Sequence, residues 1–439
     1  GLQAKNKIEA NNFAKNIFNL LFIILLFFVL VAEIFMPQLI FLIAPGFYKD
    51  PEKLKLAVDL SRITFPFLFF ISLASFFGAI LNSYNKFAAA AAAPIILNIV
   101  LIGAIIISYF HNYNIARQLS YGVTIAGILQ LIFLIYFTYR LYTPSLKYYF
   151  KISSKVKLFF KKLLPSIFSS GINQINILVG TIIASFQVGA VSYLYYADRV
   201  YQINLAIAGI AVGTVSLPVL SKAFKKKNFL KVSNIQNKSL QLSLLFSMPA
   251  SLGLIIASKE IVNGLFGYGS FTPNDVEMTS QALMFFGYGV IAFALIKILS
   301  NFFFARDNTK TPFYISSFIV FLNVVISLTF FKNIGFIIIP IATSISSWIG
   351  VLIFLYLLKK NNVLLLQKKL FLNTSKIIIS SVIMSIVLVI ALEKYSYYLN
   401  YTYTYKSIYL LIIVGFAGII YLLSCYLLGL LKAKNYKTN

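Results

Sequence analysis

The feature that most constrains this chain is a succession of long apolar runs. Charged residues, Gly and Pro bound about twelve of them, and each is close to the roughly 20 residues that a membrane-crossing helix needs. The predicted spans are residues 13–36, 54–82, 92–110, 119–142, 163–186, 192–221, 239–265, 278–304, 312–331, 334–358, 371–392 and 406–431. Because lipid offers the backbone no hydrogen-bond partners, every span is expected to be a helix. The sequence therefore predicts an all-α polytopic membrane protein.

Composition supports this class, because 60% of the residues are hydrophobic and only 11% are charged. The net charge of +27 does not indicate nucleic acid, since the basic residues form short clusters between apolar spans. We expect these clusters to attract anionic membrane lipids and to set the topology.

The loop charges also predict an orientation. One set of alternate loops holds most of the Lys and Arg residues, for example around Lys151, Lys225 and Lys359, and the opposite set holds few. The positive-inside rule then places the first set, and both ends of this chain, in the cytoplasm.

Catalysis is not expected. The chain has one histidine, His111, and one cysteine, Cys425. It has no Gly-rich phosphate loop, no nucleophile motif and no paired carboxylates within the spans. The sequence therefore indicates no enzyme, no metal site and no cofactor.

An internal repeat is suggested at an offset of about 220 residues. A Gly-containing outer turn (44–50 and 265–271) and a polar inner turn (81–87 and 303–312) recur, with Pro94 and Pro312 at or near the start of the next helix. Ordinary helical hairpins can give such a pattern by chance; a true repeat predicts two related lobes around a central path, as in transporters.

Prolines also lie within the predicted spans, at Pro37, Pro66, Pro218, Pro249 and Pro340. Each removes one backbone hydrogen bond. They are either tolerated kinks or flexing points of a transport cycle.

Polar residues are dense in the fifth span, where Asn173, Gln174, Asn176 and Thr181 follow Pro165. Several share one half of the helix surface, so this side should turn away from lipid. It either makes interhelical hydrogen bonds or lines a hydrophilic cavity.

The stretch from Gly189 to Lys227 carries two consecutive charges, Asp198 and Arg199, inside an apolar span. Neighbouring positions on a helix point about 100° apart, so each charge is expected to have another partner. One interpretation is a structural ion pair near the interface. The other is an Arg199 that presents its donors to an anionic headgroup while Asp198 orients it.

Three further charges lie within spans. Lys297 and Glu33 are either snorkelling residues or functional groups, and Arg62 is interpreted as an interfacial anchor.

Several blocks of the sequence are recognisable, namely APGF at 44–47, RITFPFLFFISLASFFGAILNSYNKFAA at 62–89, YYADRVYQI at 195–203, GIAVGTVSLPVLSKAF at 209–224 and FFARDNTKTP at 303–312. Together these blocks resemble the MurJ (MviN) family of lipid II flippases, which belongs to the multidrug/oligosaccharidyl-lipid/polysaccharide (MOP) exporter superfamily. The resemblance implies a two-lobe bundle that moves an undecaprenyl-diphosphate-linked peptidoglycan precursor, lipid II, across the bacterial inner membrane by alternating access. It places Arg199 at the family's functional arginine, with Asp198 before it. Asn173, Gln174 and Lys297 complete the predicted substrate-binding set.

The resemblance also predicts the division of the chain. The family has fourteen spans, and the twelve predicted here look like its third to fourteenth, so we expect a bundle lacking the first two helices. Residues 1–150 would then form an incomplete first lobe of four helices, 151–362 a second lobe of six, and 363–439 two extra helices. Asn204, Ala206 and Ala90 stand where Pro or Gly is common in the family, so helix breaks there are expected to differ.

Other functions stay open at this point. The chain could be an exporter of a related lipid-linked glycan, a drug/cation antiporter, or an inactive fragment or membrane scaffold. An antiporter would need an acid within the membrane, for which only Glu33 and Asp198 are candidates. Lipid II, anionic lipids and proteins of peptidoglycan synthesis are the expected partners, and a monomer is the expected state.

Overall fold

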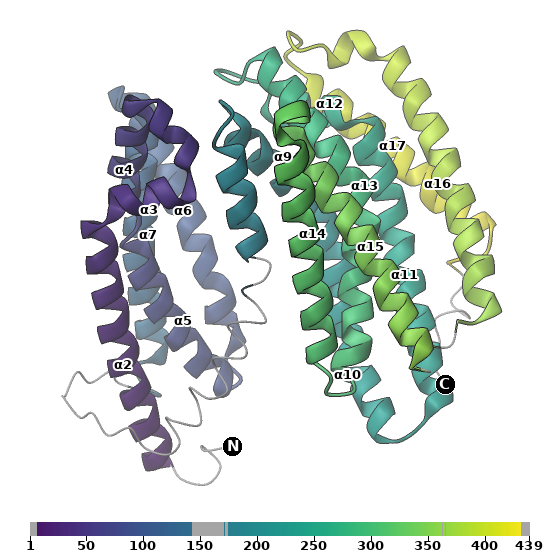
Figure 1. Cartoon of the computed structure of the whole chain (residues 1–439), viewed down its shortest axis with the longest axis horizontal. Helices are drawn as coiled ribbons and strands as arrows, with labels where there is room; N and C mark the ends of the chain where they lie inside the picture. The colour runs from purple at the N-terminus through teal and green to yellow at the C-terminus, as the bar shows by residue number, and fades with distance from the viewer. Residues whose placement is uncertain (1–6, 143–170, 172–173, 362, 365, 432–439) are drawn as a thin grey trace. The chain divides into compact units, whose positions relative to one another are not determined.

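The computed structural model of the chain describes residues 7–142, 171, 174–361, 363–364 and 366–431. Within these residues all regular secondary structure is helical (Figure 1). This confirms the predicted fold class, and it is the outcome expected when backbone groups must be satisfied within lipid.

The apolar helices match the predicted spans closely. The described residues contain 10 candidate membrane spans, of which the longest, Lys310–Lys360, folds as two helices. Every predicted span coincides with described helices except 163–186, which lies partly outside the described residues. Its described part includes an apolar helix over Gln174–Ala184. The chain is therefore a multi-pass membrane protein.

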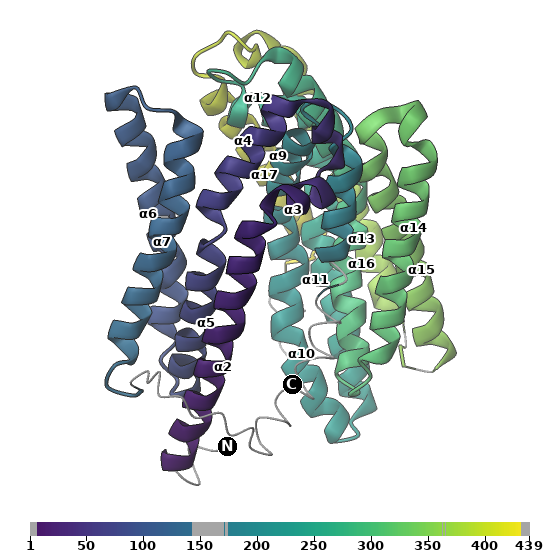
Figure 2. The same cartoon turned by 60° about the vertical axis from the view of Figure 1, so that its left-hand side comes forward.

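The chain divides into two compact units, Gly1–Ser170 and Gly171–Asn439. The separate status predicted for 363–439 stays a prediction. The described helices of the first unit are α2 (Lys7–Ile34), α3 (Met36–Ile43), a 3-10 turn η1 (Pro45–Lys49), α4 (Pro51–Thr64), α5 (Phe67–Ser83), α6 (Phe87–His111) and α7 (Ile115–Thr138). Its core joins α2 and α5 to α6 and α7 through residues such as Phe18, Phe77 and Leu134. The courses of these four helices can be followed in Figure 2.

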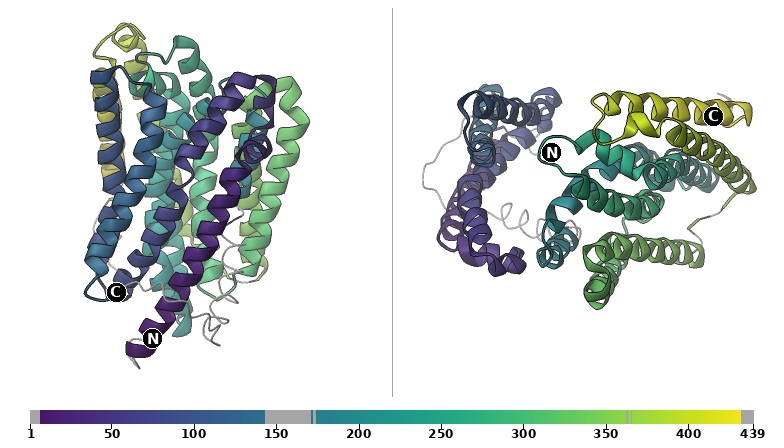
Figure 3. Two further views of the ribbon diagram at one scale, coloured as in Figure 1. Left: turned by 90° about the vertical axis from the view of Figure 1, so that its left-hand side faces the viewer. Right: turned by 90° about the horizontal axis from the view of Figure 1, so that it is seen from above.

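The second unit holds more helices around one central helix, α13. They are α9 (Ala190–Leu205), η2 (Ala206–Ala211), α10 (Val212–Lys225), α11 (Phe229–Ile256), α12 (Ser258–Phe266), α13 (Pro273–Phe304), α14 (Lys310–Ile334), η3 (Gly335–Ile337), α15 (Ile338–Lys360), α16 (Lys368–Lys394), η4 (Ser396–Leu399) and α17 (Lys406–Leu427). Seen from above, α16 and α17 lie along one side of the unit and α14 and α15 along the other (Figure 3). Helix α13 packs between them against α9, α11 and α15.

Helix bounds confirm the predicted internal repeat. Helices α2 and α11 are each 28 residues long, and they begin at Lys7 and Phe229. The starts of α3 and α12 (36 and 258) and of α4 and α13 (51 and 273) keep the same offset in sequence. Both α4 and α13 begin with a side-chain N-cap followed by Pro, Asp50 in one and Thr272 in the other.

The inner turns repeat in the same register. Asn85 and Asp307 both adopt positive φ, at 60° and 58°. In each turn the next amide donates to a carbonyl five residues back, Lys86 to Leu81 and Asn308 to Phe303. This is the Schellman pattern that ends many helices. Because these positions keep the offset of the helix starts, the turn is part of the repeat.

The prolines act in two different ways. Pro37 lies at the start of α3, and Pro66 separates α4 from α5, so both mark helix boundaries. Pro218 and Pro249 lie inside continuous helices. Pro94 corrects one expectation: it lies inside α6, well after the first turn at Phe87. Helices in a bilayer tolerate such a proline when neighbouring groups satisfy the freed carbonyl.

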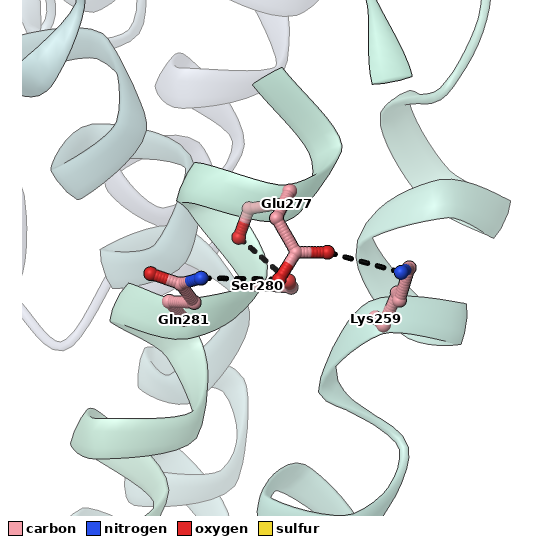
Figure 4. Close-up of polar contacts among 4 residues, drawn as sticks. All are labelled: Lys259, Glu277, Ser280 and Gln281. Atoms are coloured by element: carbon pink, nitrogen blue, oxygen red, sulfur yellow. Dashed lines mark hydrogen bonds and ion pairs between the residues drawn. The ribbon is translucent and has the colours of Figure 1, made fainter. Parts of the chain in front are cut away.

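Two predicted spans are also less regular than expected. The span 192–221 contains η2, one turn of π-helix between α9 and α10. The span 239–265 is interrupted after Ile256, and its second part is the short helix α12. Lys259 on α12 forms an ion pair with Glu277 on α13, with 3.0 Å between Nζ and Oε2 (Figure 4). Gln281, one turn further along α13, donates to the other oxygen of Glu277 at 3.0 Å.

Candidate functional site

Helix α9 gives the two intramembrane charges different partners. The Asp198 carboxylate accepts a hydrogen bond from the Gln202 amide, one turn further along. The Arg199 guanidinium lies over the ring of Tyr195, one turn back, with 4.7 Å from Cζ to the ring centroid. The two neighbours therefore have separate partners, as their angular separation predicted.

Arg199 keeps its donors available. The side chain is exposed, and it makes no hydrogen bond or ion pair with any residue that the structure describes. Contact with an aromatic face holds a guanidinium in place without using its N–H groups. Such a planar fork can bind a phosphate through two parallel hydrogen bonds.

A pocket of about 470 Å³ lies beside these residues in the second unit. Its walls come from the helix over residues 174–184, from α9 and from α13, α14 and α15. The polar or charged residues along it are Gln174, Asn176, Thr181, Tyr195, Asp198, Arg199, Tyr201, Gln202, Asn323, Ser327 and Thr343. The pocket therefore combines one cation, one acid and many neutral hydrogen-bonding groups with apolar walls such as Phe286 and Ile339.

One wall of the pocket is a neutral hydrogen-bond network across three helices. The Asn323 amide donates to Asn176 Oδ1 at 2.8 Å and to Thr343 Oγ1 at 3.0 Å. The Ser327 hydroxyl donates to Asn323 Oδ1 at 3.0 Å. Both interpretations of the polar fifth span hold for Asn176, because it makes an interhelical hydrogen bond and also lines the pocket.

Of the other predicted site residues, Gln174 lines the same pocket as Asp198 and Arg199. Asn173 lies outside the described residues. Lys297 does not line the pocket; it is exposed on α13, and its Cγ stands 3.5 Å from where a Cβ on Gly209 of η2 would lie. The structure thus brings three of the five predicted residues together.

Asn323, Ser327 and Thr343 were not predicted. A signal existed, because Asn323 and Ser327 are four residues apart and therefore share one face of an apolar helix. The chemistry offered by the whole site is binding. Among the described residues no group of three or more His, Cys, Asp or Glu side chains could hold a metal ion.

Comparison with known proteins gives one family along nearly the whole chain. The family model for the lipid II flippase MurJ matches residues 2–410. A probable lipid II flippase MurJ of Rickettsia prowazekii is 40% identical over 417 residues, which cover 94% of this chain and 80% of that protein. A relative of the same name from Rhizobium tropici is 34% identical over 393 residues, covering 88% of this chain and 74% of the relative.

Solved structures agree with this relationship. A lipid II flippase MurJ in an inward closed conformation superposes with a TM-score of 0.80 at 29% identity, over 97% of this chain and 85% of the other. An inward-facing MATE family transporter of the MOP superfamily gives a TM-score of 0.67 at 14% identity, over 81% and 82% of the two chains, which shows the shared fold alone. From the family model, the relatives and the structure together, this chain belongs to the MurJ family of lipid II flippases.

Proposed function

We propose that this chain translocates lipid II, the undecaprenyl-diphosphate-linked peptidoglycan precursor, between the leaflets of the bacterial inner membrane by alternating access. Family membership supports the substrate, since the relatives carry the name lipid II flippase. The observation that carries the proposal within the molecule is the exposed Arg199 guanidinium beside the pocket, held by Tyr195 with its N–H donors unused.

In this proposal Arg199 binds the diphosphate of the substrate. A guanidinium pairs with phosphate oxygens through charge-assisted hydrogen bonds, which are about twice as strong as neutral ones. Asp198 accepts a hydrogen bond from Gln202, so in this proposal it orients a polar group beside the cation. Gln174 and Asn173 would contact the sugar or peptide part, and Lys297 would meet the headgroup at another stage of the cycle.

The finer points of location and partners belong to the same proposal. The distribution of loop charges supports an orientation with both ends of this chain in the cytoplasm. The basic loops would bind anionic lipids. Proteins of peptidoglycan synthesis would supply and receive the substrate, and the chain would act as a monomer.

Complementation tests the role of Arg199. In bacteria depleted of their own lipid II flippase, the unaltered protein should restore growth and Arg199→Ala should fail at equal membrane abundance. Arg199→Lys should restore growth only partly, because an ammonium cannot form the bidentate contact.

A matched control is Arg306→Ala. Arg306 lies over the ring of Phe224 at 4.6 Å, a contact like that of Arg199, but it does not line the pocket. It should restore growth. Normal growth with Arg199→Ala would contradict the proposed role of this residue, and failure of the unaltered protein would contradict the proposed flippase activity of this chain.

A further inference from the structure

Lys406, the first residue of α17, is a buried lysine with only 2% of its surface exposed. Its ammonium donates to the carbonyl of Gly267 at 2.5 Å and to that of Tyr401 at 2.6 Å. The rings of Tyr268 and Tyr401 lie 4.2 and 4.5 Å from the same nitrogen. A buried charge is costly unless it is paired. Here two carbonyl dipoles and two aromatic faces replace its water.

Further hydrogen bonds connect residues 399–407, which link η4 to the start of α17, to the end of α12 and the turn that follows it. The Tyr401 hydroxyl donates to the Phe271 carbonyl at 2.7 Å. The Ser407 hydroxyl donates to the Gly264 carbonyl at 2.6 Å, and the Asn263 amide donates to the Leu399 carbonyl at 2.8 Å. The α16–α17 pair is therefore tied to residues 263–271 of the same unit by side chains on both sides.

The same turn contacts the functional helix. The ring centroids of Phe266 and Phe271 lie 4.8 and 5.3 Å from the ring centroid of Tyr196 on α9. Tyr196 is adjacent to Tyr195, whose ring holds the Arg199 guanidinium, and it stands about one turn before Arg199. A continuous set of contacts therefore runs from Lys406 through residues 266–271 to the helix that carries Arg199.

We propose that Lys406 is a positioning residue: it fixes the turn 267–271 against α9, so that α9 presents Arg199 to the pocket. Without the ammonium, the carbonyls of Gly267 and Tyr401 lose a charged donor in a buried place, and the turn relaxes to find other partners. The two extra C-terminal helices then act on the substrate site without contacting it. The substrate part of this inference rests on the proposed function, whereas the positional part does not.

Spin-label distances test the positional part directly. In the full chain with Cys425→Ala, labels at Ser192→Cys on α9 and Glu393→Cys on α16 occupy exposed positions. Double electron–electron resonance should give a narrow distribution with Lys406 present and a broader or shifted one with Lys406→Met. An unchanged distribution would overturn the proposal.

Lys376→Met is the matched control. Lys376 on α16 donates to the Leu428 carbonyl beyond α17 at 2.9 Å, so it is also a lysine–carbonyl tie of this helix pair, but it does not touch the turn 267–271. It should leave the distribution unchanged. If Lys406→Met does not fold, Tyr401→Phe removes only the bond to Phe271 and should shift the distribution in the same direction by less; no shift there would also overturn the proposal.

Lipid II binding tests the consequence for the site. Lys406→Met should raise the half-saturating lipid II concentration roughly three- to tenfold, with Lys376→Met unchanged. Combined with Tyr196→Leu, it should add little further loss, because both changes interrupt the same set of contacts. Full additivity would overturn the route through Tyr196. If the unaltered chain binds no lipid II, the proposed function fails, and the label distances still decide the role of Lys406.

Discussion

The helices α4 and α5 of the first unit and the single helix α13 of the second occupy equivalent places in the repeat, yet only the first is broken. Both begin with a side-chain cap and Pro, and both end in the same left-handed turn. Phe65 and Pro66 separate α4 from α5 near the middle of this segment. In contrast, α13 continues through the equivalent residues Gly287 and Tyr288. The helix is therefore interrupted in one half and continuous at the equivalent place in the other.

The two halves share a hydroxyl donor at this place. Thr124 on α7 donates to the Ile63 carbonyl, and Ser344 on α15 donates to the Phe285 carbonyl at 2.7 Å. Ile63 and Phe285 hold equivalent positions in the repeat. In both halves a hydroxyl thus donates to the equivalent carbonyl, although the two donors are offset by two residues in the repeat, and the proline is the difference. Since α9 packs on α13, the candidate substrate site is built on the unbroken half.

Introducing a proline break into α13 of the second half should have the largest effect on stability. Tyr288→Pro removes a backbone donor within α13 and should destabilise the protein by about 3 kcal/mol, the usual cost of proline inside a helix. Pro66→Ala should change stability much less, because it restores a donor where the surroundings already accept a break. Thermal unfolding in detergent measures both. Equal losses of stability would mean that the first half depends on its break as much as the second half depends on its continuous helix, which would contradict the comparison.

Removing the hydroxyl donor from each half should give a smaller difference in stability loss between the two halves. Thr124→Val should cost about 1 to 2 kcal/mol, because the Ile63 carbonyl lies in the last turn of α4, where a helix cannot supply all of its own backbone donors. Ser344→Ala should cost about 0.5 kcal/mol, near the average for interhelical bonds in membranes, because the Phe285 carbonyl lies within a continuous helix. The same thermal measurement checks both, and a larger loss for Ser344→Ala would reverse the comparison.

Patterns local in the sequence predicted much of this fold. Span positions follow from apolar runs, and the repeat follows from turns that recur at a constant offset. Asp198, Arg199 and Gln174 were predicted from charge or polarity inside a span, and they line one pocket. The prediction of these three residues needs no knowledge of their packing, because placing a charge or an amide in lipid costs free energy wherever the helix lies.

Features that depend on distant partners were not predictable in this way. Asn323 bonds to Asn176 across 147 positions of sequence, so its role needs the packing of α14 on the fifth span. The burial of Lys406 depends on the carbonyl of Gly267, 139 residues away in sequence. The π-helical turn η2 arises in an apolar run whose pattern is that of an ordinary helix.

The smallest expected difference between the halves concerns the ion pair between Lys259 and Glu277, which ties α12 to α13. In the first half the equivalent positions of the repeat hold Pro37 and Lys55, which cannot form it. Both partners are substantially exposed, at 65% and 41% of their side chains, and exposed pairs contribute about 0 to 1 kcal/mol.

Glu277→Gln should therefore lower stability by less than about 1 kcal/mol at low salt, and the loss should vanish near 1 M salt, where the screening length is about 3 Å. Gln281→Leu is the control, because it removes the neighbouring bond to Glu277 without removing the charge pair, and its effect should not depend on salt. A loss well above that of an exposed pair that persisted at high salt would mean that this pair fixes α12 on α13 as firmly as the buried contacts of Lys406 fix the turn that follows α12.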